Sequence, residues 1–356
     1  MGIFTITTQT LRLRRPFGKT LGFAVVILII LVGLCEGIAR INFIQRFLPM
    51  QSIGSGHVTI DVKLSRLNTF VKKEGRVDCF FLGSSMVYRA INPEVFQDAY
   101  KSHTGKDILC FNFALGGVSE LSTSALSEIL IKLYQPKLLI IGTSPLNLRE
   151  HAGLGTAKKI LNNPWIKYHL GFFSINGWLI DNSFAFRHYV GFRTLLNPLA
   201  RSKEQKKELE MTAYGFGGRR ADKKHAAPRI TIKAPQELED VKDYENSQSN
   251  LAAIEQIMQL KNQATILFIE MPCHQSAFSL FRRGEEDYDR GIGMIDNAAK
   301  RYGVQFWHTM PFNFMSDEGW NDSRHMSSVG AEIFSRWLGE TVGKAVKQGT
   351  LGDPTR

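Results

Sequence analysis

Two short motifs, far apart in the chain, hold residues that could perform nucleophilic catalysis together. Ser85 follows the apolar run 77–83, directly before a predicted helix. Gly83 ends that run and would let the chain turn tightly out of a strand, exposing the Ser85 hydroxyl above a sheet. His325 comes three residues after Asp322, so the carboxylate can turn back and hold one imidazole tautomer. These residues predict a nucleophile (Ser85), a general base (His325) and an acid that orients the base (Asp322).

Both motifs also have purely structural explanations. Serine is common in loops, and an aspartate shortly before a helix often caps it. A further histidine, His274, follows the apolar run 264–270, but no acid stands beside it in the sequence to orient its ring. We therefore expect His274 to support the site rather than to react.

The segments around these motifs alternate between short apolar runs and helical patterns. Strands are predicted at 77–83, 108–114, 137–143, 264–270 and 304–308, and helices at 93–100, 119–134, 285–302 and 327–345. Such alternation favours right-handed β-α-β units and a parallel sheet that is covered on both faces. The expected fold class is α/β, a three-layer α/β/α sandwich whose active groups gather at the carboxyl ends of the strands.

The two motifs, in this order, resemble those of the SGNH (GDSL-like) hydrolase superfamily. In that superfamily a G-D-S block after the first strand supplies the nucleophile, and a late D-x-x-H block supplies the acid and the base. The corresponding blocks here are Gly83-Ser84-Ser85 and Asp322-Ser323-Arg324-His325. The resemblance covers about 77–145 and 264–345, and it implies acyl-ester chemistry at Ser85.

The same resemblance implies donors for an oxyanion hole. Gly117, after the second predicted strand, matches a family glycine whose backbone N–H contributes to that hole, together with the N–H of Ser85. The family's G-x-N-D block reads Gly142-Thr143-Ser144-Pro145 here. Ser144 therefore takes the place of the asparagine, and Asn147 is a second candidate donor. Alternatively, the glycine pair at 116–117 serves only the turn before the next helix.

With Ser84 in place of the family's aspartate and Ser144 in place of its asparagine, the sequence resembles a divergent, membrane-anchored branch of the superfamily. That branch serves cell-envelope acyl transfer. That branch includes the alginate O-acetylation proteins and the teichoic-acid D-alanyl transfer protein. The resemblance implies a serine O-acyltransferase or esterase that acts on a cell-envelope polysaccharide or another acyl acceptor, with a membrane-bound O-acyltransferase as a partner. The alternative is a catalytically weak binding or scaffold subunit of a polysaccharide modification or export assembly.

Residues 20–41 are a predicted transmembrane anchor. The run is long enough for a bilayer core, and Glu36 and Arg40 lie at its far end, where charged groups can reach the headgroups. The segment 1–19 carries four cations and no acid, so it should stay cytoplasmic. We expect a single-pass protein of a bacterial inner membrane with a periplasmic domain. A cleaved signal peptide is not expected, because Cys35 and Glu36 at the end of the apolar run do not form the usual cleavage site of small residues. A buried core helix is not expected either, because the segment is apolar on every face.

The expected organisation is a cytoplasmic tail (1–19), the anchor (20–41), a polar, irregular stalk (42–76), the SGNH-like domain (77–345) and a short tail (346–356). An insertion at about 150–250 interrupts the strand–helix alternation. Its first half is aromatic, and its second half is strongly basic. We expect a helical lid or docking element at the mouth of the site; the alternative is an extra layer behind the sheet.

The composition narrows the possible partners. The formal net charge is +11 and the isoelectric point is about 9.5. Nucleic acid is not expected, because the domain should be exported and no nucleic-acid motif is present. The basic half of the insertion would face membrane lipid or an anionic polysaccharide, or would be a solvated loop. No Cys/His cluster has metal-ligand spacing, and no cofactor is predicted.

Overall fold

The protein is built around a parallel sheet. The structure, a computed structural model, describes residues 16–48, 51–149, 153–195, 211–217, 247–313 and 315–355. The strands are β1 (Cys79–Gly83), β2 (Cys110–Asn112), β3 (Leu138–Thr143), β4 (Thr265–Glu270) and β5 (Gln305–Trp307), in the order β2-β1-β3-β4-β5. β2 and β3 flank β1, so the chain reverses its path across the sheet there. Ligands of open α/β sheets bind at the carboxyl ends of the strands, at such a reversal.

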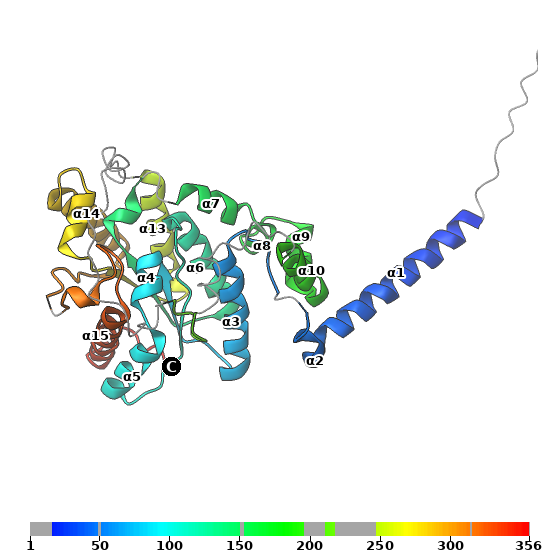
Figure 1. Ribbon diagram of the computed structural model, residues 1–356, viewed down its shortest axis with the longest axis horizontal. Helices are drawn as coiled ribbons and strands as arrows, with labels where there is room; N and C mark the ends of the chain where they lie inside the picture. The colour runs from blue at the N-terminus through cyan, green and yellow to red at the C-terminus, as the bar shows by residue number, and fades with distance from the viewer. Residues whose placement is uncertain are drawn as a thin grey trace, which may run out of the picture.

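Helices cover both faces of the sheet (Figure 1). One face is covered by α3 (Val58–Glu74), α6 (Glu120–Tyr134) and α13 (Gln248–Gln259), and the other by α4 (Ser85–Ala90), α5 (Pro93–Thr104) and α15 (Ser328–Lys347). The helix α14 (Glu285–Tyr302) contributes to both layers. The connections include the 3₁₀ helices η1 (Pro145–Leu148), η3 (Leu260–Asn262), η4 (Gln275–Leu280) and η5 (Asp317–Gly319). This is the predicted α/β/α sandwich.

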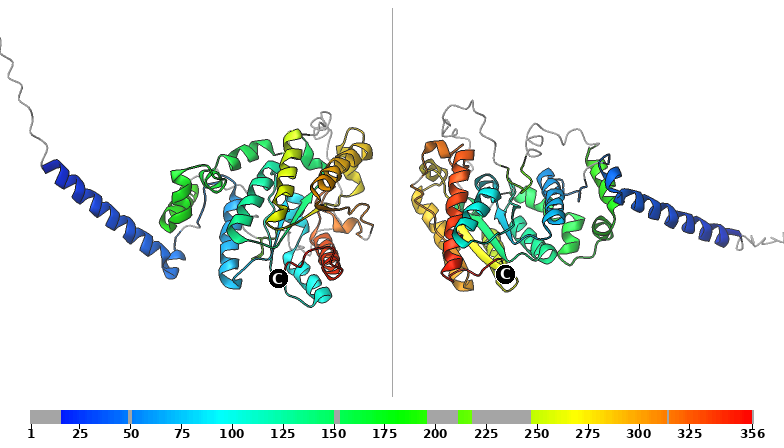
Figure 2. Two further views of the ribbon diagram at one scale, coloured as in Figure 1. Left: turned by 180° about the vertical axis from the view of Figure 1, so that it is seen from behind. Right: turned by 90° about the horizontal axis from the view of Figure 1, so that it is seen from below.

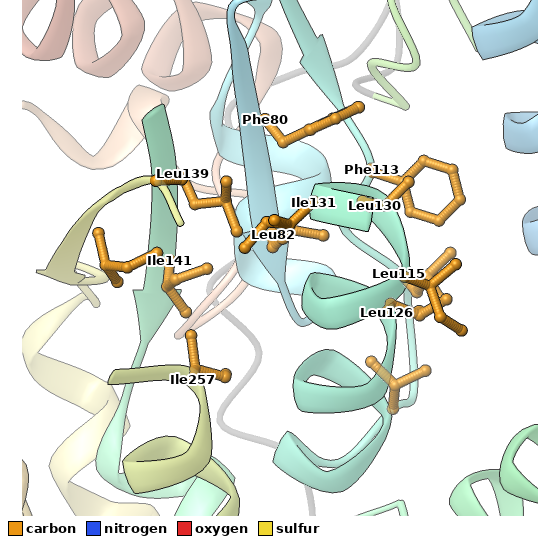
Figure 3. Packing of buried hydrophobic residues seen from close by; sticks show 14 of the residues in the cluster. Phe80, Leu82, Phe113, Leu115, Leu126, Leu130, Ile131, Leu139, Ile141 and Ile257 are labelled. Carbon is orange, nitrogen blue, oxygen red and sulfur yellow. The ribbon is translucent and has the colours of Figure 1, made fainter. Parts of the chain in front are cut away.

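Successive residues of β1 point to opposite layers, as a strand requires. Phe80 and Leu82 belong to the core under α3, α6 and α13, whereas Phe81 belongs to the core under α5 and α15. Figure 3 shows Phe80 and Leu82 of β1 in one cluster with residues of α6, β3 and α13. With both faces buried, the strands read as continuous apolar runs, and this is why the sequence reveals them.

Two predicted segment boundaries are wrong. Residues 58–74 were expected in an irregular stalk, but they form α3, and Ile60 and Leu67 are fully buried against the sheet. Their helical spacing is obscured by Asp61 and Lys63, which are buried on the same helix. The tail expected from 346 is also packed, because α15 runs to Lys347 and Leu351 is buried.

The N-terminal helix α1 (Pro16–Arg40) projects from the domain (Figures 1 and 2). Within it, 22 residues from Lys19 to Arg40 are long and apolar enough to cross a bilayer, and none of their most apolar stretch is buried. A short helix, α2 (Asn42–Gln45), follows. The first 15 residues, which hold three of the four predicted cytoplasmic cations, lie outside the described part of the chain.

The described part of the insertion divides into two groups. The helices α7 (Leu154–Leu161), α8 (Pro164–His169), α9 (Ile175–Asn182) and α10 (Phe184–Leu195) extend from α6 to the end of α1 (Figure 1). The segment 211–217 instead packs at the edge strand β2, where Asn112 N–H donates to the Tyr214 carbonyl at 2.9 Å. The aromatic helices α8–α10 thus lie beside α1 rather than over α4. Most of the basic half lies outside the described residues.

Candidate active site

Ser85 is presented by a tight turn between β1 and α4. Gly83 ends β1 with φ +137, a conformation that favours glycine. A Cβ on Gly83 would come within 2.4 Å of the Gly142 carbonyl oxygen, so the close approach of β1 and β3 also requires glycine. The Ser84 side chain then caps α4 by accepting a hydrogen bond from the Met86 N–H. Ser85 is consequently the first residue of α4, at the carboxyl end of the sheet.

The structure brings Ser85, His325 and Asp322 together. Ser85 Oγ lies 2.7 Å from His325 Nε2. On the other side of the ring, His325 Nδ1 lies 2.8 Å from Asp322 Oδ2 and 3.0 Å from Oδ1. With the proton on Nδ1 directed at the carboxylate, Nε2 is free to accept the Ser85 hydroxyl proton. The predicted nucleophile, base and acid therefore form one continuous hydrogen-bonded chain.

The loop that carries His325 is fixed by its own backbone. Asp322 Oδ1 accepts the N–H groups of Arg324 at 3.0 Å and of His325 at 2.9 Å. His274 also supports the loop, because its backbone N–H donates to the Ser323 carbonyl at 2.9 Å. The alternative for Asp322, a cap of the next helix, is not observed, because Ser327 caps α15 while Asp322 binds its own loop and the ring.

Electrostatics keeps the imidazole neutral and the carboxylate charged. Burial lowers the pKa of His325; Asp322 opposes this effect, and Arg89 and Arg324 lower the pKa further. Burial alone would raise the pKa of Asp322, but its hydrogen bonds with His325 and with two backbone N–H groups hold it well below the ordinary value. A neutral ring next to a charged acid is the state in which His325 can take up a proton from Ser85.

The loop that carries Gly117 passes beside Ser85. A Cβ built on Gly116 would lie 3.9 Å from Ser85 Cβ, and Gly117 follows it with φ +68. The Leu115 N–H donates to the Gly83 carbonyl at 3.0 Å and holds this loop against the end of β1. The His57 ring binds the Gly116 carbonyl through Nε2 at 3.1 Å. The loop is therefore placed where its backbone N–H groups could serve an oxyanion near Ser85.

Ser144 and Asn147, the other predicted donors, are engaged elsewhere. Ser144 is fully buried and caps η1 by accepting the Leu146 N–H at 3.3 Å. Asn147 Nδ2 donates to Glu120 Oε1 at 2.8 Å. The structure thus brings the Gly116–Gly117 loop to the nucleophile and gives Ser144 and Asn147 local structural contacts.

Sequence reasoning missed four residues around the site. Glu120 is fully buried, and burial raises its pKa to about 7. Arg89 stands one helical turn after Ser85, a spacing that could have placed it beside the site. Arg324 lies inside the predicted D-x-x-H block. Lys63 was hidden in the expected stalk.

Lys63 ties three segments together behind α4. It is fully buried, and its Nζ donates to the carbonyls of Asn112 at 2.6 Å and Gly215 at 2.8 Å. The ammonium group also lies 4.4 Å from the centroid of the Tyr88 ring. This single cation thus joins the end of β2, the helix that carries Ser85 and the segment 211–217.

Comparisons with known proteins give only distant similarities. No family model matches the sequence, and no curated protein matches it. A lipase/acylhydrolase from Enterococcus faecalis is 11% identical with a TM-score of 0.37, over 79% of this chain and 100% of that one. A carbohydrate acetylesterase family member from Sinorhizobium meliloti is 11% identical with a TM-score of 0.35, over 76% and 98% of the two chains.

An inhibitor-bound aryl esterase from M. smegmatis is also 11% identical, with a TM-score of 0.34 over 76% of this chain and 99% of that one. TM-scores this low carry no inference about activity. The similarity to a hydrolase superfamily is seen in the chain's own parallel sheet and in the Gly-x-Ser and Asp-x-x-His blocks at the carboxyl edge of that sheet. In fold and in the placement of these blocks, the chain is similar to the SGNH (GDSL-like) hydrolase superfamily.

Proposed function

We propose that this chain is a membrane-anchored, extracytoplasmic serine O-acyltransferase or esterase that acts on a cell-envelope polysaccharide. The observation that carries the proposal is the distance of 2.7 Å between Ser85 Oγ and His325 Nε2, with Asp322 on the far side of the ring. Such an alignment activates a hydroxyl that is otherwise a weak nucleophile. The exposed apolar surface of α1 supports the membrane anchor.

The first half of the reaction makes an acyl-serine. Ser85 Oγ attacks the carbonyl carbon of an acyl ester while its proton passes to His325 Nε2. The carbonyl oxygen becomes an oxyanion, which backbone N–H groups of Ser85 and Gly117 would stabilise. The C–O bond to the leaving alcohol then breaks, and His325 returns the proton to that alcohol. Asp322 stabilises the imidazolium throughout without being protonated.

The second half decides between transfer and hydrolysis. A hydroxyl of a sugar, or water, attacks the acyl-serine and gives its proton to His325 Nε2. The bond to Ser85 Oγ breaks, and the proton returns to the serine. A tether to the membrane suits a donor delivered there, so a membrane-bound O-acyltransferase is the partner that we propose for the transfer reaction.

Labelling with a serine-directed fluorophosphonate tests the nucleophile. The wild-type chain should be labelled, and Ser85→Ala should not. Ser84→Ala is the matched control, because it removes the neighbouring hydroxyl and a helix cap worth about 1 kcal/mol but leaves the nucleophile. If wild type is not labelled and envelope acylation is unchanged in Ser85→Ala, the chain acts as a scaffold subunit and the proposal is wrong.

A further inference from the structure

Exposed apolar side chains are concentrated in one region of the described chain. Outside α1, nine large ones lie between the end of α1 and the turn after α2, or between the end of α8 and the end of α10, and seven of the nine are aromatic: Ile41, Phe43, Phe47, Phe172, Phe173, Ile175, Trp178, Tyr189 and Phe192. We call this set the aromatic patch. In the described residues outside 16–47 and 164–195, only Leu133 and Val329 are large, apolar and exposed. A concentration of this kind marks an interaction surface, unlike the scattered apolar residues that any surface carries.

The elements that bear the aromatic patch surround the end of the predicted membrane span. α1 contacts both α2 and α10, and α9 packs between α8 and α10 (Figures 1 and 2). The aromatic rings are also prominently exposed, since 89% of Phe173 and 48% of Trp178 are accessible. The patch therefore continues the apolar surface of α1 sideways, at the end of α1 nearest the domain.

A polar contact fixes α10 to α1. Glu36 accepts the N–H groups of Phe184 at 3.0 Å and Ala185 at 3.2 Å, and the Ser183 hydroxyl at 2.8 Å. These are the free donors at the start of α10, so the acid caps that helix from another part of the chain. Arg40 pairs with Glu36 at 2.8 Å and lies over the Phe184 ring. α10 is thus held at a defined height against α1.

Further contacts fix the same helices to the catalytic domain. The Ser52 N–H donates to the Arg187 carbonyl, and Asn163 Nδ2 donates to the Ile53 carbonyl at 2.9 Å. Both Ser52 and Ile53 are in turn held by the buried Asp61 of α3. The path from the anchor to the sheet therefore runs through hydrogen-bonded contacts and not only through the covalent chain.

We infer that the aromatic patch is a membrane-docking surface that lies in the lipid interface around the end of α1. Its occupant is the bilayer, because the patch continues a helix that is long and apolar enough to cross one and whose most apolar stretch is not buried by the domain. Aromatic rings are enriched at this depth of a membrane. The exposed cations Arg46 and Arg193 on the same elements suit anionic headgroups. Docking would hold the Ser85 site at a fixed height and orientation above the membrane. The inference rests on the proposed anchor, not on the chemistry of Ser85.

Site-specific fluorescence quenching in vesicles tests the inference with the full-length chain. Cys35→Ser removes the exposed cysteine, and the other described cysteines are buried. Single cysteines replace Phe173 in the patch, Ile30 in α1, or Val329 on α15, and each carries an environment-sensitive fluorophore. Val329 is the matched control, an exposed apolar residue of α15, and that helix lies on the opposite side of the domain from α1 (Figure 1). The vesicles contain phosphatidylethanolamine and phosphatidylglycerol, with nitroxide lipids that quench at the headgroup or deep in the acyl region.

Docking predicts that the fluorophore at 173 loses most of its emission to headgroup quenchers while the one at 329 keeps its emission. The fluorophore at 30 reports the anchor separately, through deep quenchers. Quenching at 30 without quenching at 173 overturns the docking surface and retains the anchor; a protein partner on the patch would give this result. Quenching at 173 without quenching at 30 refutes the span, and with it the anchor on which the inference rests. Fluorophosphonate labelling of Ser85 is independent of all three signals.

Discussion

Two polar clusters stand at the carboxyl edge of the sheet, and they differ in what surrounds their acid. In the first, Asp322 is 39% exposed at its side chain and its oxygens meet His325 and two backbone N–H groups. In the second, Glu120 is 1% exposed, and its Oε1 is held by Thr143 and Asn147. Glu120 Oε2 is buried and has no hydrogen-bond partner among the described residues.

The comparison shows that proximity to the reaction edge does not by itself make an acid catalytic. In the first cluster the acid, Asp322, is charged, and the imidazole ring that it binds, His325, reaches the Ser85 hydroxyl. The second holds a carboxyl whose pKa is raised to about 7 by burial, so its protonated form is well populated near neutral pH. We therefore propose that the first cluster carries out the reaction and that the second supports the η1 turn.

The largest expected effect comes from removing the nucleophile or the base. Ser85→Ala and His325→Ala should each lower kcat/KM by on the order of 10⁴-fold or more, because the two groups act as a unit. The double variant should lose little beyond either single one. Hydrolysis of an activated aryl acetate measures this. Additive losses would contradict a shared step.

Asp322→Asn should produce a somewhat smaller loss. The amide cannot hold the imidazole in the required tautomer, and the expected fall in kcat/KM is on the order of 10³–10⁴-fold. The same esterase assay measures it. Asp317→Asn is a matched control, because Asp317 is an exposed acid 3.4 Å from His274 rather than from His325. Equal losses in the two variants would show a general charge effect instead of tautomer control.

Glu120→Gln should change stability rather than chemistry. The pKa of Glu120 rises from an ordinary 4.5 to about 7 in the folded chain, so the protonated form favours folding. The contribution of Glu120 to the free energy of unfolding is fully present below about pH 4.5. It is lost as the pH rises towards 7, and the total loss is about 3 kcal/mol. The glutamine variant carries no such penalty. Its unfolding free energy relative to wild type should therefore increase between pH 5 and 8, as denaturant titrations at each pH can measure. A difference independent of pH would contradict the buried titration.

Most of the fold was predictable because its strands are buried on both faces and its helices are regularly patterned. The predicted helix 285–302 coincides with α14, and 119–134 agrees with α6 to one residue. α3 was missed because Asp61 and Lys63 interrupt its apolar pattern, and the partners of Lys63 come from distant segments.

The candidate site was predictable to the extent that its residues are close in sequence. Asp322 and His325 lie within one loop, and Ser85 directly follows a strand. Asn147 was expected as a second oxyanion donor because it follows Ser144, which takes the place of the family's asparagine, but nothing in the sequence gives the direction of its amide. That direction is set by Glu120, a residue on another element.

The smallest expected effect concerns the charges around the first cluster. Arg324 and Arg89 lower the pKa of His325 by disfavouring its protonated form. Arg324→Gln should therefore raise that pKa, so the base form is lost at a higher pH as the solution is acidified. The acidic limb of the kcat/KM profile should move to higher pH by a fraction of a unit, while kcat at high pH stays unchanged. Arg336→Gln is the matched control, since Arg336 is an exposed arginine on α15 that pairs with Glu332. A shift towards lower pH, or an equal shift in the control, would show that Arg324 does not act on the ring. The pKa of His325 would then be set by burial, Asp322 and Arg89.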